Sequence, residues 1–547
     1  MARTSEPRLI IIGSGVAGIA LACRLRSQYG YQNFTIYERE PSIGGTWYLN
    51  TYPGVGCDVD SHLYSFSFNP NPDWSRRFAD QAEILQYMHS TVDKFGVRPH
   101  VQLRTEVVAA EWDVANKVWS VNLRDTITGH AFRREAEMLV SCVGTISIPK
   151  ECDIPSSESY KGAIFHSARW NHKFDMQGKK IAVVGNGCSG AQLMPFVAEK
   201  ASKVVQFQRS PQWINERPNP SFSSFQKWCF RYIPFWNKLY RFYLWRSTDV
   251  LHSLYITGSE SLEKQRAVAQ REAEEYMTSI APKAYLDMLM PKFPLGCKRR
   301  VFDPGYLECL HKPNVELTTE RIVSFTETGL RTSKRTMDFD AVVLSTGFKI
   351  QEFLSPIKIV GANGQSLNEH WKDTRGAQAY KATFVHGFPN FGIVFGPNSF
   401  PAHNSVIFSN ETQVEFILKT LINPVLRGNF EVLNVKQAAE DSNVNQVQAG
   451  LKNMVWNEGC ANWNLDAHGR NTTNYHGPTA QFWWDLYWPV WKDFELSGGN
   501  KALPWAPWTK LNVYIFSGII ASANVVPSER LIKGIHTRGF QTIGEND

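Results

Sequence analysis

Two glycine-rich turns, each directly after an apolar run, constrain the fold more than any other feature of this chain. The apolar residues 9–12 and 181–184 are typical of buried strands, and helix-like sequence follows each turn. In this strand–turn–helix context the spacing G-x-G-x-x-G lets backbone N–H groups and a helix N-terminus face a pyrophosphate. The two turns therefore predict two dinucleotides and electron transfer between them. Their residues are Gly13, Gly15 and Gly18 in the first turn, and Gly185, Gly187, Ser189 and Gly190 in the second.

The residue that ends the strand after each turn distinguishes the two nucleotides. The first such strand, 34–37, ends at Glu38, and a carboxylate there accepts hydrogen bonds from ribose hydroxyls but repels a 2′-phosphate. The first site is therefore predicted to take FAD or NAD. The second such strand, 204–207, ends in the neutral amide of Gln208 with Arg209 beside it, which suits a 2′-phosphate. The second dinucleotide is therefore predicted to be NADPH rather than NADH.

The chain has 547 residues, which predicts more than one core, because single domains usually hold about 100–200 residues. Pro149, Pro155 and the Ser/Glu cluster that follows them indicate a linker, where we place the first boundary. We expect an α/β fold with two dinucleotide-binding, Rossmann-like domains and a helical insertion. The expected segments are 1–147 and 349–547 for the first nucleotide domain, 148–216 and 293–348 for the second, and 217–292 for the insertion.

Residues 217–292 interrupt the alternation of strands and helices. Aromatic residues crowd positions 225–245, and residues 260–289 follow a charged, amphipathic helical pattern. We interpret the segment as a helical insertion that covers a cavity. Contact of its aromatic face with a membrane or a partner protein is the alternative. Outside the insertion, the patterns also predict helices over 75–95 and 410–421.

Charge and cysteine content argue against several other classes of protein. The net charge of +7 comes from scattered Lys and Arg residues, so we do not expect nucleic-acid binding. Nine cysteines, an odd number without a C-x-x-C pair, argue against a disulfide scaffold, a structural zinc and a redox dithiol. No His, Asp and Glu set has metal-ligand spacing, so no metal site is predicted. We expect reduced thiols.

The sequence shows no sign of a membrane-spanning or secreted protein. No secretory signal opens it, and no apolar run reaches the roughly 20 residues that span a bilayer. The longest candidate, 513–526, is interrupted by polar residues and is interpreted as a buried strand or helix, with membrane-surface contact as the alternative. We expect a cytoplasmic protein without membrane contact, and favour a monomer.

Two longer motifs resemble the signatures of type I Baeyer-Villiger monooxygenases. Residues 160–171 are similar to that family's F-x-G-x-x-x-H-x-x-x-W-P/D fingerprint through Gly162, His166 and Trp170. They depart from it at Tyr160, which replaces Phe, and at Asn171, which replaces the final Pro or Asp. Residues 44–58 resemble the family's second signature, G-G-x-W followed by Tyr-Pro-Gly and then Asp. The resemblance extends over nearly the whole chain.

The resemblance implies FAD in the first site and NADPH in the second. It also implies the chemistry: NADPH reduces the flavin, O2 adds at C4a, and the peroxyflavin attacks a ketone to give an ester or lactone. Arg209 and Lys298 match cations at the 2′-phosphate, and Trp463 resembles a tryptophan near the nicotinamide. We interpret His166 as a hydrogen-bonding hinge rather than a base. Besides the turn residues and Glu38, the implied cofactor-binding residues are Gly45, Thr46, Trp47, Asp58, Tyr64, Arg209, Lys298 and Trp463.

Three adjacent cations, Lys298, Arg299 and Arg300, favour contact with an anion, because adjacent like charges repel unless they are solvated or face negative charge. The resemblance implies that Arg299 is the catalytic arginine and Asp58 its carboxylate partner. A fixed guanidinium suits both the peroxide anion and the oxyanion formed from the ketone, and a nearby carboxylate orients it.

The residues also weigh against three alternatives. A flavin monooxygenase that oxidises nitrogen or sulfur carries Tyr or Phe at the position of Trp170 and generally lacks the Lys298–Arg299 pair. A pyridine-nucleotide disulfide reductase needs a redox dithiol, which this sequence does not offer. A non-catalytic protein that binds flavin and NADP has no use for a cation aimed at the flavin, so the presence of Asp58 and Arg299 favours an enzyme.

Overall fold

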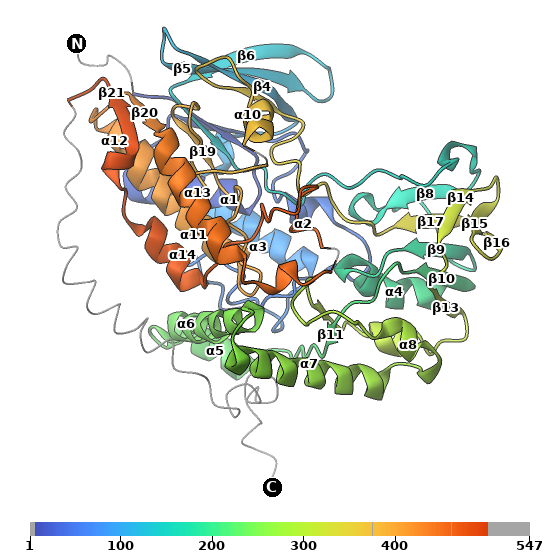
Figure 1. Cartoon of the computed structure of the whole chain (residues 1–547). Coiled ribbons are helices and arrows are strands. Elements are labelled where there is room, and N and C mark those ends of the chain that lie inside the picture. Colours follow the sequence, from blue (N-terminus) through green and yellow to red (C-terminus); the bar gives the residue numbers. More distant parts are fainter. Residues whose placement is uncertain (1–5, 375, 461, 501–547) are drawn as a thin grey trace.

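The computed structural model describes residues 6–374, 376–460 and 462–500. Two five-stranded sheets organise this part of the chain, and Figure 1 places them in two distinct bodies. In each sheet the central strand leads into a glycine-rich turn and a helix. The predicted α/β fold with two dinucleotide-binding domains and a helical insertion is confirmed.

The first sheet is entirely parallel, in the order β19-β7-β1-β2-β3. Its central strand β1 is paired on both sides and buried along its whole length, which explains the unbroken apolar run that encodes it. The strand β19 comes from the C-terminal third of the chain, so the two ends of the sequence share this sheet. The strands are β1 Leu9–Ile12, β2 Phe34–Tyr37, β3 Val101–Gln102, β7 Met138–Ser141 and β19 Phe391–Ile393.

The second sheet repeats this plan in the order β13-β10-β9-β17-β8, again with every pair parallel. The strand β8, which carries the fingerprint, lies at one edge of this sheet. Its partner β17 lies between β8 and the turn-bearing strand β9. The strands are β8 Ala163–His166, β9 Lys180–Val184, β10 Lys203–Phe207, β13 Val315–Thr318 and β17 Ala341–Leu344.

Four smaller sheets extend the two bodies. The strands β4 and β5 are part of the mixed sheet β18-β4-β5-β6. The strands are β4 Thr105–Asp113, β5 Val118–Asp125, β6 Ala131–Ala136 and β18 Lys358–Val360 in that sheet; β14 Ile322–Phe325, β15 Gly329–Thr332 and β16 Thr336–Asp338 in the next; and the pairs β11 Ile214–Asn215 with β12 Val301–Phe302, and β20 Val432–Val435 with β21 Phe494–Ser497.

Helices cover the sheets and form the insertion. After β1 the helix α1 runs to Tyr29 and stops at Gly30, whose φ of +61° favours glycine. The helices of the two nucleotide-binding bodies are α1 Val16–Tyr29, α2 Thr46–Leu49, α3 Gln81–Lys94, α4 Cys188–Lys200, α9 Tyr306–Cys309, α10 Leu367–Asp373, α11 Val406–Ile417, α12 Asn423–Leu426, α13 Gln437–Leu451 and α14 Thr479–Tyr487.

The insertion is helical, as predicted. It consists of α5 Ser224–Tyr232, α6 Trp236–Asp249, a 3-10 helix Val250–Tyr255, α7 Glu260–Ile280 and α8 Leu286–Leu289. Figure 1 shows α5, α6 and α7 along one side of the molecule, below α14 and α4. One stripe of α7, made by Ala269, Ala273 and Met277, is buried in the core of the second body.

Three predicted helices differ from the observed ones at their ends. The helix expected over 75–95 begins at Gln81, because the Asp80 side chain accepts from the Glu83 N–H at 2.9 Å and caps the first turn. The pattern over 260–289 breaks after Ile280, where Pro282 cannot continue the helix. The helix expected over 410–421 begins earlier, at Val406, and continues through a π-helical turn, Leu418–Ile422, into α12.

The expectation of reduced thiols is wrong for two cysteines. Cys297 and Cys460 form a disulfide although 163 residues separate them in sequence, and seven cysteines are free. No local spacing could reveal this pair, because only the fold brings the two Cα atoms to 6.2 Å. Every helix within the described residues is too short or too polar to cross a membrane. The apolar run 513–526 lies outside the described residues.

Candidate active site

The first glycine turn has no room for side chains. Gly13 has a φ of +94°, and a Cβ atom there would lie 2.9 Å from the Cys142 carbonyl oxygen. A Cβ atom on Gly18 would clash with the Gly13 carbonyl oxygen, and one on Gly45 would lie 2.9 Å from the Cα atom of Gly15. The turn and the second signature are therefore packed backbone against backbone, beside an open cavity.

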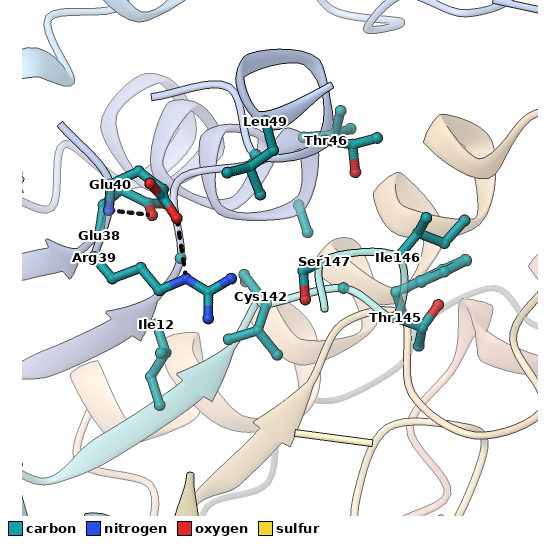
Figure 2. A pocket seen from close by; sticks show the side chains of 18 of the residues that line it. Ile12, Glu38, Arg39, Glu40, Thr46, Leu49, Cys142, Thr145, Ile146 and Ser147 are labelled. Atoms are coloured by element: carbon teal, nitrogen blue, oxygen red, sulfur yellow. Dashed lines mark hydrogen bonds and ion pairs between the residues drawn. The ribbon is translucent and has the colours of Figure 1, made fainter. Parts of the chain in front are cut away.

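This cavity gathers most of the residues that the sequence assigned to the first cofactor. Figure 2 shows Glu38 on one side of it and Thr46 near its opposite end. The Trp47 indole donates a hydrogen bond to the Tyr64 hydroxyl at 3.0 Å, which fixes both rings at the cavity wall. Gly18 lies behind the turn rather than in the cavity wall. The lining residues predicted from the sequence are Gly13, Gly15, Glu38, Gly45, Thr46, Trp47 and Tyr64.

Glu38 holds the first turn in place. One carboxylate oxygen accepts from the Ser14 N–H at 2.8 Å and from the Ser14 hydroxyl at 2.9 Å, and the other accepts from the Glu40 N–H at 3.0 Å. The sequence did not single out Arg39, which pairs with Glu40 at 3.3 Å and also lines the cavity. A carboxylate beside a close-packed turn, with flat walls opposite, fits an adenine dinucleotide such as FAD.

The second turn repeats the same geometry with a different partner. A Cβ atom on Gly190 would lie 2.5 Å from the Gly185 carbonyl oxygen, whereas one on Gly187 would meet no atom within 4 Å. Here Gln208 stands where Glu38 stands in the first body: it accepts from the Asn186 side chain at 2.9 Å. Open space at Gly187 and a neutral amide at this position fit the pyrophosphate of a second dinucleotide.

Two cations flank the end of β10. The Lys298 ammonium donates to the Ser210 hydroxyl at 2.6 Å, and burial, aided by the positive charge of Arg209, lowers the pKa of Lys298. Within the described residues neither cation has a carboxylate within ion-pair distance. Two like charges held together without an anion suit a phosphate, as predicted for the 2′-phosphate of NADPH.

Arg299 and Asp58 are brought together from the two bodies. The Arg299 Nε and Nη2 atoms donate to Asp58 Oδ2 at 3.0 and 2.5 Å. Burial acts to lower the pKa of the guanidinium, but the Asp58 carboxylate outweighs it and the pKa is raised. The guanidinium therefore stays charged, lies 5.9 Å from the Phe400 ring centroid, and opens on one side into a second cavity.

The insertion supplies one wall of this second cavity. Its apolar walls are Val59, Phe78, Leu244, Leu251, Tyr255, Phe302 and Ala402, and its polar groups include Asp58, Glu216, Arg299, Arg300 and His403. Apolar walls with the Arg299 guanidinium held in place by Asp58 suit an uncharged organic molecule that carries a polarisable oxygen.

The sequence did not reveal His403, which lines this cavity. Its Nε2 atom lies 3.0 Å from Oδ1 of the buried Asp249, which also accepts from the Thr479 N–H at 2.7 Å. Burial acts to raise the pKa of Asp249, but hydrogen bonds from His403 and Thr479 offset it and hold the pKa at about 2. His403 and Asp249 are 154 residues apart, so no motif could have indicated them.

Tyr52 and Gln192 connect the loop that carries Asp58 to the second body. The Tyr52 hydroxyl donates to Gln192 Oε1 at 2.7 Å and lies 3.2 Å from the Ser189 hydroxyl. The Gln192 amide in turn donates to the Gly56 carbonyl at 3.0 Å. The loop is therefore hydrogen-bonded to α4, immediately after the second glycine turn.

The fingerprint residues pack around the edge of the second sheet. A Cβ atom on Gly162 would clash with the Tyr160 ring, whose hydroxyl donates to the Phe339 carbonyl at 2.7 Å. His166 Nδ1 accepts from the Ala168 N–H at 3.0 Å, and burial lowers the pKa of His166 to about 4. The Trp170 ring lies edge-on to a neighbouring ring at 5.1 Å. These contacts suit the predicted hinge better than a proton-transferring base.

Trp463 lies close to the paired charges. Its ring centroid is 5.2 Å from that of Phe400, the ring that also lies 5.9 Å from the Arg299 guanidinium. Its carbonyl accepts from the Gln351 amide at 2.8 Å. Across the described residues, no group of three His, Cys, Asp or Glu side chains could hold a metal ion.

Comparison with known proteins shows that the chain is similar to flavin-dependent enzymes. Residues 6–224 match the family model described as Flavin-binding monooxygenase-like. The chain is 36% identical over 478 residues to a Baeyer-Villiger monooxygenase from Streptomyces coelicolor, which covers 87% of this chain and 90% of that protein. Among solved structures, it is similar to the OTEMO complex with FAD and NADP (TM-score 0.78, 25% identity, 90% of this chain and 100% of that one). A steroid monooxygenase bound to NADP gives a TM-score of 0.79 at 27% identity, with the same coverage.

Proposed function

The chain belongs to the Baeyer-Villiger monooxygenases, and we propose that its oxygenation centre is the cavity that holds the Arg299–Asp58 pair. The protein is an FAD- and NADPH-dependent enzyme that inserts one oxygen atom from O2 next to a ketone carbonyl, giving an ester or lactone. The observation that supports this centre is a partly buried guanidinium, kept charged by Asp58, that opens into a largely apolar cavity.

The two glycine turns would hold the cofactors. Glu38 and the second signature fit FAD, and Arg209 with Lys298 fits the 2′-phosphate of NADPH. Bound FAD, once reduced by NADPH, supplies the activated oxygen that enters the ketone. The close glycine packing described above supports this assignment, since only backbone can approach a pyrophosphate so closely.

Arg299 would stabilise the negative charge that develops on the ketone oxygen. A preorganised donor in a cavity that excludes water is most effective where charge develops, because it needs no reorganisation. Asp58 fixes the guanidinium plane through two N–H groups, and the guanidinium also lines the cavity in which the substrate would bind. Since the raised pKa keeps Arg299 charged, it acts as a donor and not as a base.

The remaining sequence predictions are carried forward as proposals. The strands β17 and β13 support the segment 293–348 as the second part of the NADP domain, and β19 supports 349–547 as the second part of the FAD domain. A monomeric state and a cytoplasmic location stay predictions.

The experiment that tests the function is NADPH consumption in air by the FAD-loaded protein, with linear, cyclic and aryl ketones, followed by product mass. We expect at least one ketone to accelerate turnover and to gain one oxygen atom as an ester or lactone. If only amines and sulfides gain oxygen, the protein is the nitrogen- or sulfur-oxidising alternative and the assigned role of Arg299 is wrong.

A further inference from the structure

Exposed apolar side chains concentrate on one small part of the molecule. Of the fifteen large apolar side chains that are exposed within the described residues, nine belong to α5, α6 and the turn between them. They are 38–71% exposed, and most are aromatic. A contiguous apolar patch of this kind on a protein surface marks an interaction site. The nine residues, here called the aromatic face, are Phe225, Trp228, Tyr232, Ile233, Phe235, Trp236, Leu239, Phe242 and Tyr243.

Helical periodicity creates the aromatic face. In α5, Phe225, Trp228 and Tyr232 follow an i, i+3, i+7 pattern, and their ring centroids lie 6.2 and 5.9 Å apart. The opposite side of α5 is anchored: the Phe230 ring lies 4.1 Å from the His62 ring. The hairpin is therefore fixed to the protein by its inner side and presents its outer side to the surroundings.

The charges that the hairpin itself carries between residues 224 and 248 are all positive. Residues 224–248 contain five Lys and Arg residues and no Asp or Glu. Arg241 points inward to the buried Glu411, and Arg231 pairs with Asp73 at 2.5 Å. The other three cations have no carboxylate within ion-pair distance among the described residues. They are Lys227, Lys238 and Arg246.

We propose that the α5–α6 hairpin docks on the surface of an anionic lipid bilayer. Trp, Tyr and Phe side chains insert at the headgroup level, where an amphipathic ring is most stable, while Lys and Arg contact lipid phosphates. Docking of this kind is peripheral and needs no spanning helix.

Charge complementarity favours an anionic bilayer over two other partners for the aromatic face, a second copy of the chain and the segment 501–547. A second copy of the chain would bring two equally cationic surfaces together. The segment 501–547 carries five Lys and Arg against three Asp and Glu, so its charge does not complement the hairpin either. An anionic membrane surface supplies the missing negative charge at every position along the face.

The inner side of the same hairpin lines the cavity that holds Arg299, so the proposed docking also bears on how the substrate reaches that cavity. Leu244, Ser247 and Thr248 of α6 line the cavity that holds Arg299, while Leu239 and Phe242 of the same helix belong to the aromatic face. A single helix thus separates the bilayer from the cavity. On the premise of the proposed function, the substrate is a lipid-soluble, apolar ketone that enters the cavity from the membrane.

The docking is tested by flotation of the FAD-loaded full-length protein with vesicles of phosphatidylcholine alone or mixed with phosphatidylserine. We expect binding to the anionic vesicles that falls with added salt. The triple variant Phe225→Ser, Trp228→Ser, Phe242→Ser should bind at least about tenfold more weakly, because each insertion is lost. The charge variants Lys227→Gln and Lys238→Gln should each weaken binding about fivefold.

A matched control replaces three exposed apolar residues elsewhere, with Val114→Ser, Ile127→Ser and Val323→Ser. This control should bind like wild type. Wild-type protein that floats with neither vesicle overturns the proposal. The proposal is also overturned if the double variant Phe516→Ser, Ile519→Ser loses vesicle binding while the triple variant, here called the hairpin variant, keeps it. It is overturned as well if wild type sediments as a dimer without lipid and only the hairpin variant sediments as a monomer.

The substrate step has a separate readout. With a long-chain ketone dissolved in the anionic vesicles, the hairpin variant should show an apparent KM raised by about tenfold, and an unchanged KM for a water-soluble ketone. Equal changes for both ketones contradict entry from the membrane. If no ketone is oxidised by wild type, the proposed function fails while the flotation result stands on its own.

Discussion

Arg299 donates two hydrogen bonds to Asp58 across 241 residues of sequence, from the edge of the second nucleotide-binding body to a loop of the first. Neither residue makes this contact unless both bodies are folded and correctly placed. The charge pair therefore reports on the assembled enzyme and is the most direct target for substitution.

Arg299→Ala should abolish ester formation while the protein keeps FAD and still consumes NADPH. Removal of one preorganised donor to a developing oxyanion costs about 10²–10³ in kcat. Flavin absorbance, NADPH oxidation and product mass measure the three steps separately. Arg98→Ala, which removes a comparable ion pair with Asp93 on the surface, is the control. Near-wild-type ester production by Arg299→Ala would show that the guanidinium has no catalytic role.

Substitution of Arg209 or Lys298 by Ala should raise the KM for NADPH roughly tenfold or more, the value of a charge-assisted hydrogen bond, and leave the KM for NADH unchanged. Gln208→Glu should favour NADH, because the new carboxylate repels the 2′-phosphate. Lys203→Ala, at the other end of β10 and paired with Glu316, should change neither constant. Equal effects on both cofactors would mean that the phosphate lies elsewhere.

Substitution of two glycines in the second turn should affect NADP binding and protein stability separately. Gly187→Ala has space for its methyl group, so we expect unchanged stability but at least about tenfold weaker NADP binding in calorimetry. Gly190→Ala would press against the Gly185 carbonyl and should lower the free energy of unfolding by about 1–3 kcal/mol. Unchanged NADP binding by Gly187→Ala would contradict the assigned position of the pyrophosphate.

Acid should destabilise the protein below about pH 6.5. Burial lowers the pKa of His62 to about 4 and that of His252 to about 3, so both stay neutral in the folded state. Between these values and the unfolded pKa, the unfolded chain binds more protons. The stabilisation is therefore complete above about pH 6.5 and is lost as pH falls, up to about 3 kcal/mol for His62 and about 5 kcal/mol for His252.

Thermal unfolding at a series of pH values measures this effect. His62→Asn should flatten the profile, whereas the exposed His130→Asn should leave its slope unchanged. A melting temperature that stays constant from about pH 7.5 to 5 would mean that these histidines are protonated in the folded protein.

The disulfide gives a prediction that needs no activity. When the protein is purified in air without a reducing agent and alkylated under denaturing conditions, seven of its nine cysteines should be modified. Reduction before alkylation should also make Cys297 and Cys460 reactive. Intact mass and peptide mapping count the modified residues. Nine modified cysteines without reduction would show that the two thiols stay reduced, as the sequence alone suggested.

Local patterns predicted the parts of the site that are encoded locally. Strand, glycine turn and helix are adjacent in sequence, so the residues around Gly13 and Gly185 could be assigned without coordinates. The Arg299–Asp58 pair was implied only by resemblance to a family. His403 with Asp249, and Cys297 with Cys460, depend on how the bodies and the insertion pack, and residue spacing does not encode that packing.

The hydrogen bonds from Tyr52 to Gln192 and from Gln192 to Gly56 fasten the loop of Asp58 to the second body in addition to its contacts with the first. By sequence this loop is part of the flavin body, but it is fastened to a helix of the other one. The acid and its arginine are thus both linked to the second body, Asp58 through its loop and Arg299 through its own chain. A displacement of the second body relative to the first would therefore act on the two partners of the ion pair in the same direction.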